Sequence, residues 1–292
     1  MLAFNKINKC FGDFHVLKDI DFSIESGKIF GYLGRNGAGK TTSLRILMDV
    51  FKPSSGTITI DDKVFMRDDY KIGYLPEERG MYAKSKVKDQ LIYFAMLRGA
   101  TRQEATESVN YWAHQFDVEM YLNQRLETLS KGNQQKIQIT QAFLNEPDIL
   151  ILDEPFSGLD PVNAQIFQDA LLEYKEAGRF IIFSSHQMSY VESFCDDIAI
   201  IDHGQIILSG NLKEIKEERS QNRYAITSED TNIELYLNDF VKKGNVYLVK
   251  IEEDPMQMMR ELIEKGIVIE AFSKYEPSLH EIFVSEVGEH DE

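Results

Sequence analysis

The chain has 292 residues, of which 43% are hydrophobic and 27% charged, a composition typical of a globular protein with a sizeable core. Its 48 acidic and 32 basic residues give a formal net charge of −16, which argues against nucleic acid as a partner. No apolar run approaches the ~18–20 residues that a membrane-spanning helix needs, so no such helix is expected.

Hydrophobic patterning in the first two thirds of the chain predicts alternating strands and helices. Residues 20–25 alternate between apolar and polar side chains, as in a strand with one buried face. Residues 28–33 predict a short buried strand, and continuous apolar runs at 149–152, 180–183 and 198–201 predict strands that are buried on both faces, as in a parallel sheet. Helical segments separate these runs, so the sequence favours an α/β fold.

Two regions depart from this alternation. Residues 87–145 are rich in helix formers and predict an all-helical insertion between two parts of the sheet. Residues 221–292 contain 16 acidic and 7 basic side chains. Within them, alternating runs at 246–251 and 267–272 flank a helix expected over 255–265, which predicts a small α+β domain.

A glycine-rich loop follows the strand expected over 28–33. It matches G-x-x-x-x-G-K-[ST], a pattern that cradles nucleotide phosphates when it joins a buried strand to a helix. Glycines let successive N–H groups face one cavity, and the helix N-terminus adds partial positive charge. Lys40 is expected to reach the β- and γ-phosphates, and the Thr41 hydroxyl to ligate Mg²⁺. The expected nucleotide-binding residues are Gly34, Arg35, Asn36, Gly37, Ala38, Gly39, Lys40, Thr41 and Thr42.

Two carboxylates end the apolar run at 149–152. Asp153 is expected to hold Mg²⁺ through water. Glu154 is expected to act as general base, or to orient the water that attacks the γ-phosphate. His186 follows the next expected strand, where it can hydrogen-bond the γ-phosphate or that water. Lys40, Glu154 and His186 are therefore the candidate catalytic residues.

The sequence Leu-Ser-Lys-Gly-Asn at 129–133 resembles the signature L-S-G-G-Q of ABC-type ATPases. The order of phosphate loop, signature, D-E-P, S-G-L-D and a later histidine also resembles that family, whereas kinases and GTPases lack the signature. The resemblance implies that residues 1–215 form an ABC nucleotide-binding domain, which is a P-loop NTPase. Such a domain has a mixed sheet core, an antiparallel β subdomain and an inserted helical subdomain. Residues 221–292 would then be a small C-terminal accessory domain.

The resemblance also assigns residues outside the phosphate loop. Phe11 stands where the family has an aromatic residue that stacks on adenine. Glu77 stands where the family commonly has a glutamine that senses Mg²⁺ and the membrane partner. A carboxylate there should ligate the metal more strongly than an amide would. Glu78 could fill this position instead.

The signature residues serve a second subunit in this family. Ser130 and Gly132 would contact the γ-phosphate held by the other subunit's loop, and a helix N-terminus is suited to that task. Lys131 and Asn133 depart from the common Gly and Gln, although Asn133 keeps an amide. Asp160, in the S-G-L-D turn, joins the expected nucleotide site.

The resemblance implies an ATP-hydrolysing subunit of an ABC transporter that uses ATP and Mg²⁺. It would form a homodimer, or a heterodimer with a second ABC ATP-binding subunit, that closes on ATP and opens after hydrolysis. This cycle would drive export by a separate integral membrane permease whose coupling helix docks near residues 77–98. The P-E-E-R-G-M-Y stretch and the ending P-S-L-H-E-I-F-V resemble exporter-type subunits of the sodium-efflux and drug-resistance subgroup.

The expected location is cytoplasmic, at the inner face of the cell membrane through the permease. The start of the chain does not resemble a signal peptide. Cys10 and Cys195 are the only cysteines, and both are expected to be free thiols buried as small apolar side chains in a reducing compartment.

Two alternatives remain. One is a soluble ABC ATPase acting in translation or DNA repair, although the chain has one phosphate loop and one signature and lacks a coiled coil between them. The other is an adaptor without ATPase activity, against which the set Lys40, Asp153, Glu154 and His186 argues.

Overall fold

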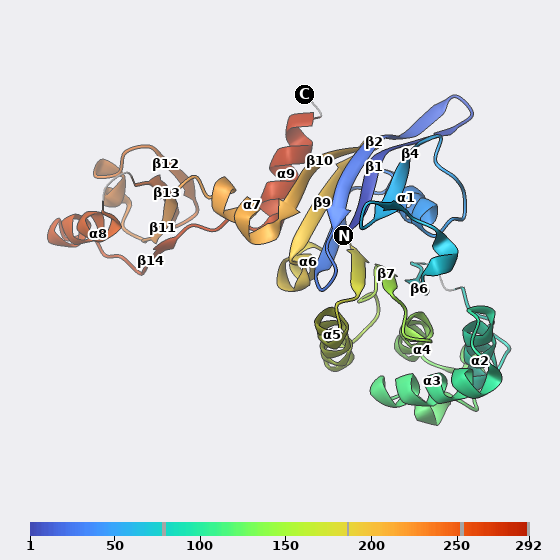
Figure 1. Ribbon diagram of the computed structural model, residues 1–292. Coiled ribbons are helices and arrows are strands. Elements are labelled where there is room, and N and C mark those ends of the chain that lie inside the picture. Colours follow the sequence, from blue (N-terminus) through green and yellow to red (C-terminus); the bar gives the residue numbers. More distant parts are fainter. Residues whose placement is uncertain (78–79, 186, 252–253, 291–292) are drawn as a thin grey trace. The chain divides into compact units, whose positions relative to one another are not determined.

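The computed structural model describes four stretches of the chain: residues 1–77, 80–185, 187–251 and 254–290. The chain divides into two units, Met1–Gly210 and Asn211–Glu292 (Figure 1). Helix α7 (Leu212–Arg219) belongs to the second unit, where Lys216 forms an ion pair with Glu276 at 2.6 Å.

An antiparallel sheet forms one layer of the first unit. Its strand order is β2-β1-β4-β5: β2 (Phe14–Ile24), β1 (Leu2–Phe11), β4 (Ser55–Ile60) and β5 (Lys63–Val64). Alternate side chains point inward, as the apolar–polar pattern predicts, and the rings of Phe4 and Phe22 stack across paired strands at 4.5 Å.

A six-stranded sheet forms the second layer. Its order is β10-β9-β3-β8-β7-β6: β10 (Gln205–Asn211), β9 (Asp197–Asp202), β3 (Ile29–Leu33), β8 (Phe180–Ser184), β7 (Ile149–Asp153) and β6 (Ile72–Leu75). The five strands from β9 to β6 pair in parallel. Every residue of β3 and β7 is buried, as expected for apolar strands covered on both faces.

Helices cover both faces of this sheet. Helix α1 (Lys40–Leu47) contributes Leu44 and Leu47 to a core that also contains inward residues of the antiparallel sheet. On the other face, α5 (Pro161–Glu176) and α6 (Met188–Phe194) bring rings against Phe156, which lies 4.2 Å from Tyr190 between ring centroids.

A helical insertion lies between β6 and β7 in the sequence (Figure 1). It contains α2 (Val87–Leu97), α3 (Arg102–Gln115) and α4 (Lys131–Phe143). The described residues also contain four short 3₁₀ turns: η1 (Arg67–Asp69), η2 (Glu119–Tyr121), η3 (Leu126–Thr128) and η4 (Thr231–Leu235). The predicted fold class is confirmed: a mixed sheet core, an antiparallel β subdomain and a helical insertion.

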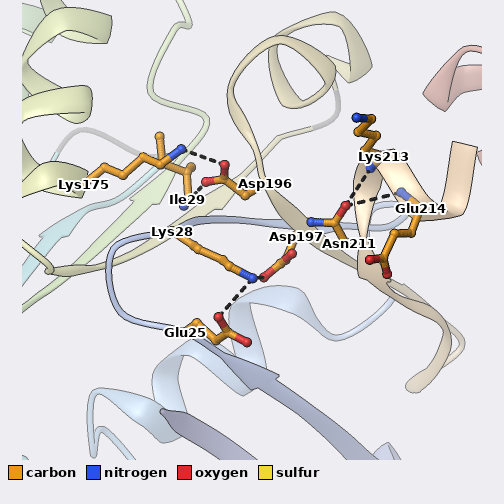
Figure 2. A network of polar contacts seen from close by, with 9 residues as sticks. All are labelled: Glu25, Lys28, Ile29, Lys175, Asp196, Asp197, Asn211, Lys213 and Glu214. Atoms are coloured by element: carbon orange, nitrogen blue, oxygen red, sulfur yellow. Dashed lines mark hydrogen bonds and ion pairs between the residues drawn. The ribbon is translucent and has the colours of Figure 1, made fainter.

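Charged residues gather where strands β3 and β9 of the six-stranded sheet begin (Figure 2). Lys28 pairs with Asp197 at 2.9 Å and with Glu25 at 3.0 Å. Asp196 accepts the Ile29 N–H at 2.9 Å and pairs with Lys175 at 2.6 Å. These contacts hold the starts of β3 and β9 together, although each half-exposed ion pair contributes only about 0–1 kcal/mol.

The second unit contains an antiparallel sheet in the order β12-β13-β11-β14: β12 (Phe240–Lys243), β13 (Val246–Lys250), β11 (Arg223–Thr227) and β14 (Ala271–Lys274). Helix α8 (Pro255–Glu264) packs Leu262 on one face, with Tyr247 and Val249. Helix α9 (Leu279–His290) follows β14.

Two details differ from the sequence-based expectation. The strand expected over 267–272 begins only at Ala271, because Ile267 is used as a core residue directly after α8. Cys10 is exposed, so only Cys195 is a buried thiol. Its burial raises the pKa of Cys195 well above the usual value. In the part of the chain that the structure describes, no helix combines the length and apolar character needed to cross a bilayer.

Candidate functional site

The strand order places the motif-bearing segments along one sheet edge. Strand β3 lies beside β8, β8 beside β7, and β7 beside β6, and all four run parallel. Parallel strands end at the same edge, where ligands bind in open α/β sheets. The phosphate loop, Ser185, the Asp153–Glu154 pair and Glu77 therefore follow neighbouring strand ends.

The phosphate loop is shaped by close backbone packing. A Cβ atom on Gly34 would lie 2.3 Å from the carbonyl oxygen of Ile201, so no larger residue fits there. Gly39 has φ +117°, and a Cβ atom on it would lie 2.6 Å from a methyl of Leu17. The loop surface differs along its length: Arg35, Asn36 and Gly37 are exposed, Ala38 and Gly39 are buried, and Thr41 and Thr42 are half-buried.

Lys40 begins α1 and folds back on its own loop. Its ammonium donates to the carbonyl oxygens of Gly34 at 2.6 Å and Arg35 at 3.2 Å. Burial lowers the pKa of Lys40, while the negative charges of Asp153, Glu154 and Glu77 oppose that effect. The three carboxylates thus act on the ammonium, although they come from segments far apart in sequence.

Asp153 ends β7 and is 5% exposed. Ser184, which ends the neighbouring strand β8, donates a hydrogen bond to Asp153 Oδ1. Burial raises the pKa of Asp153, and the charges of Glu77 and Glu154 raise it further; the Ser184 hydrogen bond and Lys40 act in the opposite direction. A cation bound here would relieve the cost of burying this charge.

Glu154 has an unusual backbone conformation. Its φ is +51°, which is uncommon for a residue with a side chain, and Pro155 follows directly. Its N–H donates to the Ser184 carbonyl at 2.9 Å, and Ser185 Oγ donates to Glu154 Oε2 at 2.9 Å. Backbone strain of this kind is found at functional sites and is retained where the surroundings enforce it. The sharp turn and the serine together orient the carboxylate.

The signature segment caps helix α4. Ser130 is exposed and accepts a hydrogen bond from the Asn133 N–H at 3.3 Å. The Asn133 amide donates to the Tyr121 hydroxyl at 2.9 Å, so it supports local structure. Gln135 donates to the Pro155 carbonyl at 3.1 Å. Helix α4 is thereby tied to the loop that follows Glu154.

The remaining expected residues take different positions. Phe11 is 50% exposed at the end of β1, and its ring meets Phe51 edge-on at 5.4 Å. The half-exposed ring is therefore accessible to a planar base. Glu77 is exposed after β6.

Asp160 caps α5 by accepting the Asn163 N–H at 3.0 Å. A Cβ atom on Gly132 would lie 3.1 Å from the Gly158 carbonyl, so the signature and S-G-L-D turns are in contact.

His186 and Glu78 lie outside the described residues. Sequence reasoning missed three side chains at this site: Ser184, Ser185 and Gln135. A sequence signal exists for two of them, because Ser184 and Ser185 place two hydroxyls directly before His186.

Two family models match the chain. Residues 17–157 match the model described as ABC transporter, and residues 210–287 match that described as ATP-binding protein DrrA1-3-like, C-terminal domain. The uncharacterized ABC transporter ATP-binding protein YhaQ of Bacillus subtilis (strain 168) is 40% identical, and the alignment covers 99% of each chain. The chain belongs to the family of ABC transporter ATP-binding proteins.

Other similarities agree with this assignment. The linearmycin resistance ATP-binding protein LnrL of Bacillus subtilis (strain 168) is 32% identical over 74% of this chain and 70% of its own. A solved ATP-binding subunit of an ABC transporter is 28% identical, with a TM-score of 0.68 over 75% of this chain and 93% of the other. The expected activity class, an ABC-type ATPase subunit, is confirmed, and a role in translation or DNA repair is not favoured.

For this ABC ATP-binding subunit, the Ser185→Ala variant is expected to lower kcat for ATP about tenfold and leave KM for ATP unchanged. The alanine removes one hydrogen bond that orients Glu154 and does not touch the phosphate loop. Steady-state ATPase assays separate the two constants. The matched control is Ser193→Ala at an exposed position of α6, where the serine hydroxyl bonds only its own helix among the contacts described. A change in KM with kcat intact would exclude the positioning role.

Proposed function

We propose that the chain hydrolyses ATP with Mg²⁺ in a two-subunit assembly and thereby drives export through a separate membrane permease. One observation carries the proposal. Asp153 ends β7 and Glu154 follows it. Each carboxylate accepts a hydrogen bond from a serine at the end of β8, the strand that lies between β7 and the strand leading into the phosphate loop.

The oxygen donors near the loop fit a magnesium ion. Thr41 offers a hydroxyl and Asp153 a buried carboxylate, and Glu77 could supply a further oxygen; Mg²⁺ prefers such ligands. Among the residues the structure describes, no group of three or more His, Cys, Asp or Glu side chains could hold a metal alone. Mg²⁺ usually takes one or two protein carboxylates and completes its shell with phosphate and water. When bound, it would neutralise charge on the phosphates.

Each remaining site residue would have a distinct task. Lys40 would exchange the loop carbonyls for the β- and γ-phosphate oxygens. Glu154, oriented by Ser185, would accept a proton from the attacking water or orient it. His186 would hydrogen-bond the γ-phosphate or that water. Phe11 would stack on the adenine, since a half-exposed aromatic ring suits that contact.

Two subunits would enclose each nucleotide. Ser130 caps α4, whose first turn contains Gly132 and Asn133, and this helix N-terminus would face the γ-phosphate held by the other subunit. Asp160 would contribute from the adjacent turn. Hydrolysis would remove the charge that joins the two surfaces, and the pair would open. The second subunit is either an identical copy or a related ATP-binding chain.

The permease would dock near residues 77–98 at the inner face of the cell membrane. Arg98 lines a cavity of about 470 Å³ beside α3 and donates to the Gln141 carbonyl at 2.8 Å. Motion of a docked segment could therefore reach α4, which carries Gln141. The name of LnrL, a resistance protein, supports export as the direction.

Affinity purification tests this proposal. The Glu154→Gln chain, purified with ATP from gently solubilised cells, should co-elute with an integral membrane protein. A Lys40→Ala chain is the control for nucleotide dependence. Co-elution with ribosomal components in place of a membrane protein would contradict the transport role.

A further inference from the structure

A cavity in the second unit is lined by three cations and two carboxylates. It has a volume of about 380 Å³. Arg219 comes from α7, Arg223 from β11 and Lys243 from β12, while Glu281 and Glu286 come from α9. Formal charges at this cavity therefore sum to a single excess positive charge.

Two of the cations are already neutralised. Arg219 pairs with Glu286 at 2.6 Å, and Lys243 pairs with Glu281. Burial favours the neutral form of Glu281, but hydrogen bonds from Lys243 and Ser278 outweigh it and lower the pKa of Glu281 to about 2. Both carboxylates are thus committed to their own partners.

Arg223 is the cation left over. Its Nε is buried without a hydrogen-bond partner among the residues the structure describes, and within that part of the chain no carboxylate forms an ion pair with it. Leaving this guanidinium nitrogen buried and unbonded costs free energy, and no carboxylate within the described chain offsets the charge. The planar guanidinium is suited to holding a carboxylate with two parallel hydrogen bonds.

The rest of the wall consists of five apolar or aromatic residues and two neutral polar ones, Gln221 and Ser285. Val241, Leu248 and Ile282 line it, together with the half-buried ring of Tyr275 and the ring of Pro277. The cavity volume lies within the range of about 300–1,000 Å³ that is typical of small-molecule sites. The cavity thus combines one unmatched charge with space for a hydrocarbon body.

We propose that this cavity binds a small molecule with a single carboxylate and an apolar body, anchored by Arg223. A polyanion fits poorly, because residues 211–292 contain 19 acidic and 10 basic side chains and would repel extra negative charge. A phosphate dianion would also exceed the one uncompensated positive charge. This site is separate from the nucleotide site, and its occupancy does not depend on the transport assignment.

Calorimetric titration of the full chain with sodium octanoate tests the proposal. Octanoate should bind with one-to-one stoichiometry, and Arg223→Gln should weaken it by about tenfold or more, as expected for a charge-assisted hydrogen bond. Octanol should bind at least about tenfold more weakly than octanoate, for the same reason. The matched control is Arg260→Gln on exposed α8, which should bind octanoate as the unaltered chain does.

A second variant guards against loss of folding. Val241→Trp, at a 43% exposed position on the cavity wall, should fill the cavity and abolish binding without changing any charge. Circular dichroism melting identifies folded variants. Absence of octanoate binding to the unaltered chain, or equal binding to Arg223→Gln or Val241→Trp, overturns the proposal. Binding of inorganic phosphate in preference to octanoate would overturn the carboxylate assignment.

Discussion

Replacing Glu154 with glutamine is expected to lower ATP turnover at least about 100-fold while leaving ATP affinity nearly unchanged. The amide cannot take a proton from the attacking water. Its oxygen can still accept the hydrogen bond that the Ser185 hydroxyl donates to Glu154 Oε2. The phosphate loop and Lys40 are untouched, so the variant should bind ATP and accumulate as a closed dimer. Phosphate release and light scattering with ATP measure the two effects.

The matched control is Glu176→Gln, an exposed carboxylate at the end of α5 that should leave turnover and oligomeric state as they are. Turnover that survives Glu154→Gln would remove the catalytic assignment. A variant that stays monomeric with ATP bound, alone and with its membrane partner, would remove the two-subunit mechanism.

Lys40→Ala is expected to raise the Kd for ATP by about 10–100-fold, the range that a lost charge-assisted hydrogen bond produces. The ammonium now bonds two carbonyl oxygens of its own loop, and phosphate oxygens are stronger acceptors for it. Binding of adenosine, which has no phosphate, should be unchanged. Calorimetry with ATP and adenosine measures both.

Lys63→Ala, on the exposed strand β5, is the matched control and should bind ATP normally. Unaltered ATP affinity in Lys40→Ala would contradict the phosphate role of the lysine. An equal loss of adenosine binding would indicate that the loop had collapsed.

The Lys40→Ala and Glu154→Gln variants remove two charges of the same nucleotide site. Lys40 and Glu154 are linked by charge, because the carboxylates oppose the lowering of the Lys40 pKa by burial. Removal of either group alters the electrostatic surroundings of the other. A double variant should therefore show a smaller loss than the product of the single effects.

The second unit shows where sequence patterns fail. The sequence pattern does not predict the short edge strand β12 or helix α9, and it predicts a strand over 267–272, where Ile267 is a core residue after α8. Alternation of apolar residues indicates burial of one face, but it does not distinguish a strand from a loop packed on a helix. In the first unit, the sequence also predicts a buried Cys10, whereas this thiol is exposed near the end of β1.

The phosphate loop and the carboxylates at the end of β7 could be recognised from the chain alone, because each motif is contiguous and its backbone requirements are local. The strand order was not available in this way, since β3, β8, β7 and β6 are neighbours in an order that differs from the sequence. The serine partners of Asp153 and Glu154 lie 31 residues later in the chain. Only the folded sheet brings them together, because parallel pairing is decided by burial across the whole layer and not by adjacent residues.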